Sequence, residues 1–178
     1  MANPTTAPFG ITLGAPVESL PVLQALDQQK YIVQPPSPHP MFESYVVMAT
    51  PQWGVVWIKG VTPTVENDGY GIQVRGTVDR LAEQLALRYG PCAKTDGMLP
   101  DAHSFGSDHW LWELWKNERL YHFLWARPQA TGLPDDLAAI YLGAKAVDVS
   151  ASHVHIEYSS AALAQAQADI ERSLAGSL

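Results

Sequence analysis

The chain has 178 residues, and 47% of them are hydrophobic, so it can bury a sizeable core and does not have a disordered composition. Eleven Lys and Arg against 18 Asp and Glu give a net charge of −7, without a basic run, which argues against nucleic acid or an anionic membrane as the ligand. Cys92 is the only cysteine, which excludes an intrachain disulfide, and no segment approaches the ~20 apolar residues of a membrane helix. We therefore expect a cytoplasmic protein.

The N-terminal region is predicted to begin with a flexible tail over residues 1–8, which is small, polar and Pro-containing and lacks the features of a signal peptide. A short strand is expected over residues 9–13. Apolar residues at helical spacing then predict a helix over residues 17–26. Pro21 inside this segment would either move the start of the helix to Ser19 or kink it.

A loop and a hairpin follow. The segment 34–40 has four prolines in seven residues, so it cannot join a helix or a central strand. The β-branched segments 42–50 and 53–61 predict a hairpin that turns at Pro51-Gln52. A short third strand is expected over residues 71–75.

The helix predicted next, over residues 77–89, has the clearest boundaries. Thr77 is a good N-terminal cap, and the charge of Asp79 suits the first turn of a helix. Gly90-Pro91 is typical of a helix end. Five residues of the helix share one apolar face: Val78, Leu81, Ala82, Leu85 and Tyr89.

The second part of the chain begins with a predicted linker over residues 91–106. Ser107 and Asp108 can cap a helix over residues 109–117, although a hairpin of residues 109–115 with residues 120–125 is an alternative. Three strands are predicted next, over residues 120–126, 137–147 and 153–158. A last helix is expected to begin after Ser159 or Ser160, with four residues on its apolar side: Leu163, Ala166, Ile170 and Leu174.

The order helix, three strands, helix is thus predicted twice, over residues 16–90 and 107–176. It predicts an α+β fold in which helices pack on an antiparallel sheet built from two similar halves. We expect residues 9–178 to form a single domain.

One strand carries residues that could bind a metal. His153, His155 and Glu157 alternate along it, so their side chains share one face, and two imidazoles with a carboxylate suit zinc or iron. The alternative, which we favour, is that these three face water while Val154 and Ile156 face the core. On that interpretation the chain has no metal site and no cofactor.

Two other segments are candidates for contact with a protein partner. Trp112 falls outside the apolar face of its predicted helix, and Glu113 is next to it, so this Trp could anchor a partner. The loop that contains Pro36 and His39 is the second candidate, because prolines stiffen a loop and reduce the entropy lost on binding. The sequence contains no nucleophile motif, zinc-protease motif or phosphate-binding loop that would indicate a catalytic residue.

Three short stretches resemble small domains of Gram-negative bacteria. The first, Phe9-Gly10-Ile11-Thr12-Leu13-Gly14, is similar to the strand and turn that open such domains, and Tyr89-Gly90-Pro91 and Glu118-Arg119-Leu120 resemble their later segments. Several domains of this kind resemble partners of toxins or of secretion systems. The resemblance implies a binding role and brings no catalytic residues with it.

These observations favour a non-enzymatic protein-binding module that would neutralise or escort a bacterial toxin or a secretion-associated protein. A homo-oligomer is compatible with the sequence. The alternatives are a metal-dependent enzyme that uses His153, His155 and Glu157, and a small-ligand binder with a site between the two halves.

Overall fold

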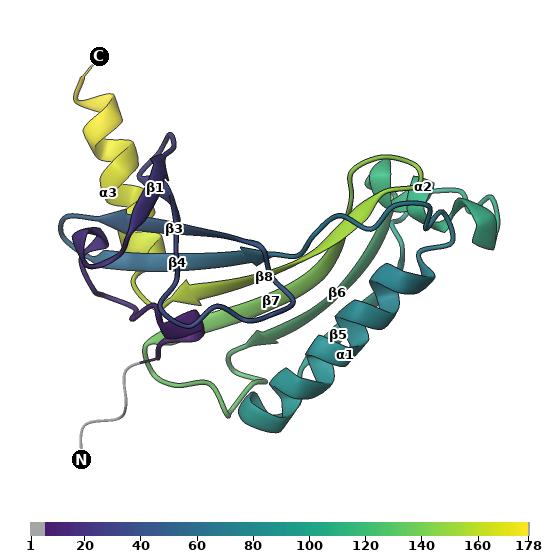
Figure 1. Cartoon of the computed structure of the whole chain (residues 1–178), viewed down its shortest axis with the longest axis horizontal. Coiled ribbons are helices and arrows are strands. Elements are labelled where there is room, and N and C mark those ends of the chain that lie inside the picture. Colours follow the sequence, from purple (N-terminus) through teal and green to yellow (C-terminus); the bar gives the residue numbers. More distant parts are fainter. Residues whose placement is uncertain (1–5, 178) are drawn as a thin grey trace. The chain divides into compact units, whose positions relative to one another are not determined.

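The computed structural model describes residues 6–177, which form one antiparallel sheet and the helices that flank it (Figure 1). The strand order in the sheet is β1-β2-β3-β4-β8-β7-β6-β5. The strands are β1 (Val22–Ala25), β2 (Lys30–Val33), β3 (Ser44–Thr50), β4 (Gly54–Val61), β5 (Ala93–Met98), β6 (Arg119–Ala126), β7 (Leu137–Ala146) and β8 (Ser152–Ser160). The α-helices are α1 (Ile72–Tyr89), α2 (Trp110–Trp115) and α3 (Leu163–Ala175). The predicted α+β class is confirmed.

The chain divides into two compact units. Among the described residues, unit 1 contains residues 6–60, 134–139 and 157–177, and unit 2 contains residues 61–133 and 140–156. Strands β7 and β8 contribute to both units, because the boundary cuts across them.

In unit 1, α3 packs against β3 and β4. The buried residues Met48, Val56 and Ala166 form the centre of this core. The turn between β3 and β4 requires a glycine at Gly54, where φ is +63° and an added Cβ would lie 2.3 Å from the carbonyl oxygen of Gly14. The tight turn therefore lets the N-terminal segment pack directly against the hairpin.

In unit 2, α1 runs along β5 and β6 (Figure 1). Trp125 is fully buried, and its indole N–H donates to the carbonyl oxygen of Gly90 at 2.9 Å. The Tyr121 hydroxyl donates to the Asp79 carboxylate at 2.7 Å, which connects the sheet to the first half of the helix. The predicted helix face is buried at four of its five positions, and Leu85 is half-buried.

The N-terminal predictions are partly wrong. The expected helix over residues 17–26 is a single 3-10 turn, Val17–Ser19, followed by β1, and the expected strand over residues 9–13 begins with another 3-10 turn, Pro8–Gly10. Part of the predicted flexible tail, residues 1–5, lies outside the described residues. Thr6, from the same segment, is buried and bonds to Asp136, so it is part of the fold.

The start of α1 and the presence of β5 also differ from the predictions. Helix α1 begins at Ile72 because the Asp68 carboxylate accepts hydrogen bonds from the backbone N–H groups of Gln73 and Val74, so residues 71–75 are not a strand. The predicted linker contains β5, which pairs antiparallel with β6.

The predicted repeat is not confirmed. The order helix, three strands, helix holds for α2, β6, β7, β8 and α3, whereas four strands precede α1. The strands predicted within residues 42–61 and 120–158, and the helices predicted at 109–117 and after Ser160, are present with small shifts of their ends.

Candidate functional site

Three loops meet at one end of unit 2, where α2 lies beside the connection between β7 and β8 (Figure 1). Backbone hydrogen bonds join them, because the N–H of Asp68 donates to the carbonyl oxygen of Ser150 at 2.9 Å and the N–H of Leu111 donates to that of Gly69 at 3.0 Å. The segment before α1, the segment that carries α2 and the β7–β8 loop are thereby held next to one another.

Large apolar side chains are exposed on these three segments and at the adjoining ends of α1 and α2. We call the group the apolar end of unit 2, and it consists of Tyr70, Ile72, Phe105, Trp115, Val147 and Val149. Ile72 is 66% exposed and Trp115 is 40% exposed. Scattered exposed apolar residues are normal in proteins, but a group of them on adjoining loops is typical of an interaction surface.

Trp112 lies at the edge of this surface and is half-buried. Its ring meets that of Phe105 edge to face, with 5.2 Å between the ring centroids. The ammonium group of Lys116 lies 4.5 Å from the ring centroid of Trp115 and 5.8 Å from that of Trp112. The aromatic rings are therefore fixed by contacts with one another and with a cation, so little rotational freedom would be lost on binding.

A buried ion pair holds α2 in place. Glu113 is fully buried, and its carboxylate accepts hydrogen bonds from the Arg119 guanidinium at 2.8 Å and from the backbone N–H of Phe105 at 3.1 Å. Burial alone would raise the pKa of Glu113, but the hydrogen bonds from Arg119, Phe105 and Ser104 and the charge of Arg119 outweigh it and lower the pKa below its usual range. Glu113 therefore remains charged and fixes the loop that carries Phe105.

The structure separates the four predicted partner-binding residues. Trp112 lies at the edge of the apolar end, whereas Glu113 is fully buried beneath it and is not accessible to a partner. Pro36 and His39 belong to unit 1. Pro36 is exposed, while the backbone N–H of His39 donates to the Tyr45 hydroxyl at 2.9 Å, so this loop is anchored to the core of its own unit.

The metal site considered for His153, His155 and Glu157 is not formed. His153, His155 and Glu157 do share one face of β8, but the His155 ring stacks on Tyr141 and Glu157 forms an ion pair with Lys59 at 3.1 Å. Among residues 6–177, no group of three or more His, Cys, Asp or Glu side chains is arranged to hold a metal ion.

Most of the apolar end could not be identified from the sequence. Phe105 lies in the predicted linker, which has no periodicity, and Ile72 lies where the sequence predicts a strand. The only local signal was Trp112, because the spacing of the other apolar residues in α2 leaves it outside the buried face. The other exposed residues are brought together by hydrogen bonds between segments that are about 40 and 80 residues apart in the sequence, and no local pattern predicts such contacts.

No helix within residues 6–177 combines the length and the apolar character that are needed to cross a lipid bilayer.

Comparison with known proteins found no match to a protein-family model, to a curated protein or to a solved structure.

Proposed function

We propose that this protein is a non-enzymatic protein-binding module and that it contacts its partner through the apolar end of unit 2. The observation that carries the proposal is the exposure of six large apolar side chains on three segments that backbone hydrogen bonds join to one another. Such a surface loses contact with water when a partner covers it, which is favourable by about 25 cal/mol per Å² of apolar area.

The residue types of the surface also support the proposal. Protein interfaces are enriched in aromatic residues, and a few aromatic anchors near the centre supply most of the binding energy. Phe105 and Trp115 are large, exposed and held by neighbouring contacts, so they are the best candidates for such anchors.

Three carboxylates on these segments suit basic residues of a partner, while the ammonium group of Lys116 lies over the rings of Trp115 and Trp112. Asp101, Asp108 and Asp148 are exposed on the same loops. Hydrogen bonds from the backbone N–H groups of Ser150 and Ala151 hold the pKa of Asp148 below its usual range, so this carboxylate is charged at neutral pH. A basic rim on the partner would complement these carboxylates and speed association. The partner class suggested by the sequence resemblance, a toxin or a secretion-associated protein, is part of the proposal.

The experiment is a quantitative affinity capture from the native cell with three baits. They are the unmodified protein, the double variant Phe105→Ser/Trp115→Ser, and the control Leu87→Ser, which changes a residue of α1 that is 91% exposed. We expect one protein to be enriched by the unmodified bait and by the control and to be lost with the double variant.

Circular dichroism of the three baits verifies that all are folded. The proposal is wrong if the double variant captures the same proteins in the same amounts. It is also wrong if the surface proves to join two copies of this chain, which sedimentation of the purified protein would show.

A further inference from the structure

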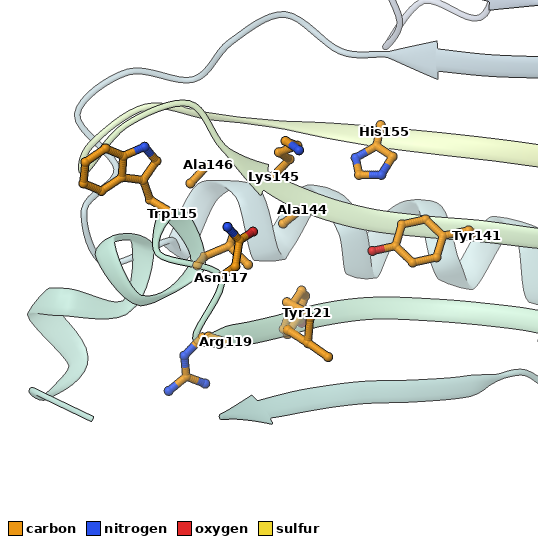
Figure 2. A pocket seen from close by; sticks show the side chains of 11 residues that line it. Trp115, Asn117, Arg119, Tyr121, Tyr141, Ala144, Lys145, Ala146 and His155 are labelled. Carbon is orange, nitrogen blue, oxygen red and sulfur yellow. The ribbon is translucent and has the colours of Figure 1, made fainter. Parts of the chain in front are cut away.

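A hollow of about 430 Å³ lies in unit 2, next to the connection between α2 and β6. Figure 2 shows its lining from α2, the connection, β7 and β8. The lining includes the side chains of Trp115, Asn117, Arg119, Tyr141, Lys145 and His155. The volume is within the range of small-molecule sites in proteins.

The charge of the hollow is opposite to that of the whole chain. The lining contains Arg119 and Lys145 and no carboxylate, although the chain has 18 acidic and 11 basic residues. Arg119 is already paired with Glu113 at 2.8 Å and with Asp96 at 3.6 Å. Lys145 is exposed and has no ion pair with any residue of the described part of the chain, so its charge is available to a ligand.

The Tyr141 hydroxyl is held at the hollow by its neighbours on three strands. The Tyr141 ring lies between two imidazoles, with centroid distances of 4.9 Å to His122 on β6 and 5.2 Å to His155 on β8. The hydroxyl rests above Gly143, where an added Cβ would lie 2.7 Å from the hydroxyl oxygen. The ring therefore leans along β7 toward Lys145, and Figure 2 shows the hydroxyl pointing in the direction of Asn117.

Asn117 and Trp115 complete the hollow on the side of α2. Asn117 ends the turn after α2 with a φ of +57°, a left-handed conformation that Asn adopts more readily than most residues. Its amide can donate hydrogen bonds to an anion. The exposed part of Trp115 adds an apolar wall next to these polar groups.

We propose that this hollow binds a small organic anion. Its charged head would lie between the Lys145 ammonium, the Tyr141 hydroxyl and the Asn117 amide, and a planar or apolar body would lie against Trp115. A carboxylate or a phosphate monoester has this chemistry. The inference goes beyond the proposed function, because the hollow is a site for a small molecule and its test needs no protein partner.

The test uses benzoate and phenyl phosphate as anionic probes and benzylamine as a cationic probe of similar size. Each is titrated into the full chain, and binding is followed by the amide resonances of α2, β7 and the Asn117 side chain. We expect saturable binding of at least one anionic probe and none of benzylamine. Lys145→Gln should weaken that binding about tenfold or more, because a hydrogen bond to a charged group is lost.

Two comparisons separate recognition from general charge. Arg80→Gln removes one positive charge from the exposed side of α1 and should leave binding unchanged. Tyr141→Phe keeps the stacked ring and should weaken binding severalfold, and Gly143→Ala should do the same by displacing the hydroxyl. The proposal is overturned if neither anion binds, if benzylamine binds equally well, or if Lys145→Gln and Arg80→Gln have the same effect.

Discussion

Two groups of tryptophans in this protein differ in the hydrogen bonds of their indole N–H groups. In unit 1, Trp53 and Trp57 pack against the core formed with α3, and their indole N–H groups donate to Asp169 at 2.9 Å and to Glu157 at 3.3 Å. In unit 2, the rings of Trp112 and Trp115 border solvent. Their N–H groups form no hydrogen bond with another described residue.

The difference lies in what covers the rings. Helix α3 has 13 residues and supplies apolar contacts to both tryptophans and the carboxylate of Asp169 to Trp53. Glu157 of β8 accepts the hydrogen bond from Trp57, so both indole N–H groups are satisfied within the chain. Helix α2 has six residues, and it buries Trp110 but places Trp112 and Trp115 at the border of the unit. A buried indole usually has a hydrogen-bond partner, whereas an exposed ring with an unused N–H is suited to contact another molecule. We therefore regard the first group as structural and the second as available for binding.

The largest effect on stability is expected at the ion pair between Arg119 and Glu113, which holds α2 and its exposed tryptophans in place. Arg119→Met should lower the free energy of unfolding by about 3–5 kcal/mol, because it leaves the buried Glu113 charge without its partner. The double variant Arg119→Met/Glu113→Leu should recover most of this loss. Urea denaturation of both variants measures it. Two equal losses would show that the uncompensated charge is not the cause.

A smaller loss of stability tests whether the two groups of tryptophans differ in their contribution to the fold. Trp57→Ala should lower the free energy of unfolding by about 2–3 kcal/mol, somewhat less than for a fully buried Trp, since Trp57 is half-buried. Trp115→Ala should change it by no more than about 0.5 kcal/mol. Thermal and urea denaturation provide both values. Similar losses in the two variants would mean that Trp115 supports the fold in the same way.

Loss of a single hydrogen bond should have a smaller effect still. Trp53→Phe keeps a ring against the core of unit 1 but removes the donor to Asp169, so we expect a loss of about 1 kcal/mol. Trp112→Phe, which removes no such bond, is the matched control. If both variants retain full stability in urea denaturation, the hydrogen bond does not distinguish the two groups.

The smallest effect concerns pH. Burial lowers the pKa of His122 below the value of about 6.5 expected in the unfolded chain. The unfolded state therefore binds the proton more readily, so stability is complete above pH ~6.5 and decreases as the pH falls toward the folded pKa. His122→Phe should make the decrease between pH 7 and pH 5 less steep in chemical denaturation. An unchanged slope would show that His122 does not contribute.

The sequence predicted the elements whose patterns are local. The hairpin around Pro51-Gln52, the strands of the second half and the end of α1 at Gly90 follow from spacing, β-branched residues and a helix-ending glycine. The start of α1 was predicted too late, because its first N–H groups are satisfied by Asp68, which lies outside the helix.

The elements that depend on distant contacts were missed. Strand β5 contains Asp96 and Gly97, which disfavour a strand, and it exists because β6 pairs with it. Of the candidate surface, only Trp112 had a local signal. The sequence predicts that Glu113 contacts a partner, whereas this residue is fully buried, because its pairing with Arg119 depends on the turn that follows α2.

The central claim, that the apolar end of unit 2 binds a protein, is tested most directly by calorimetric titration of the captured partner. Trp115→Ala should weaken binding about tenfold or more, and Trp112→Ala should weaken it by more than about 1 kcal/mol while both variants remain folded. Leu87→Ala, which truncates an exposed residue of α1, should bind like the unmodified protein. Equal affinities for all four proteins would contradict the account.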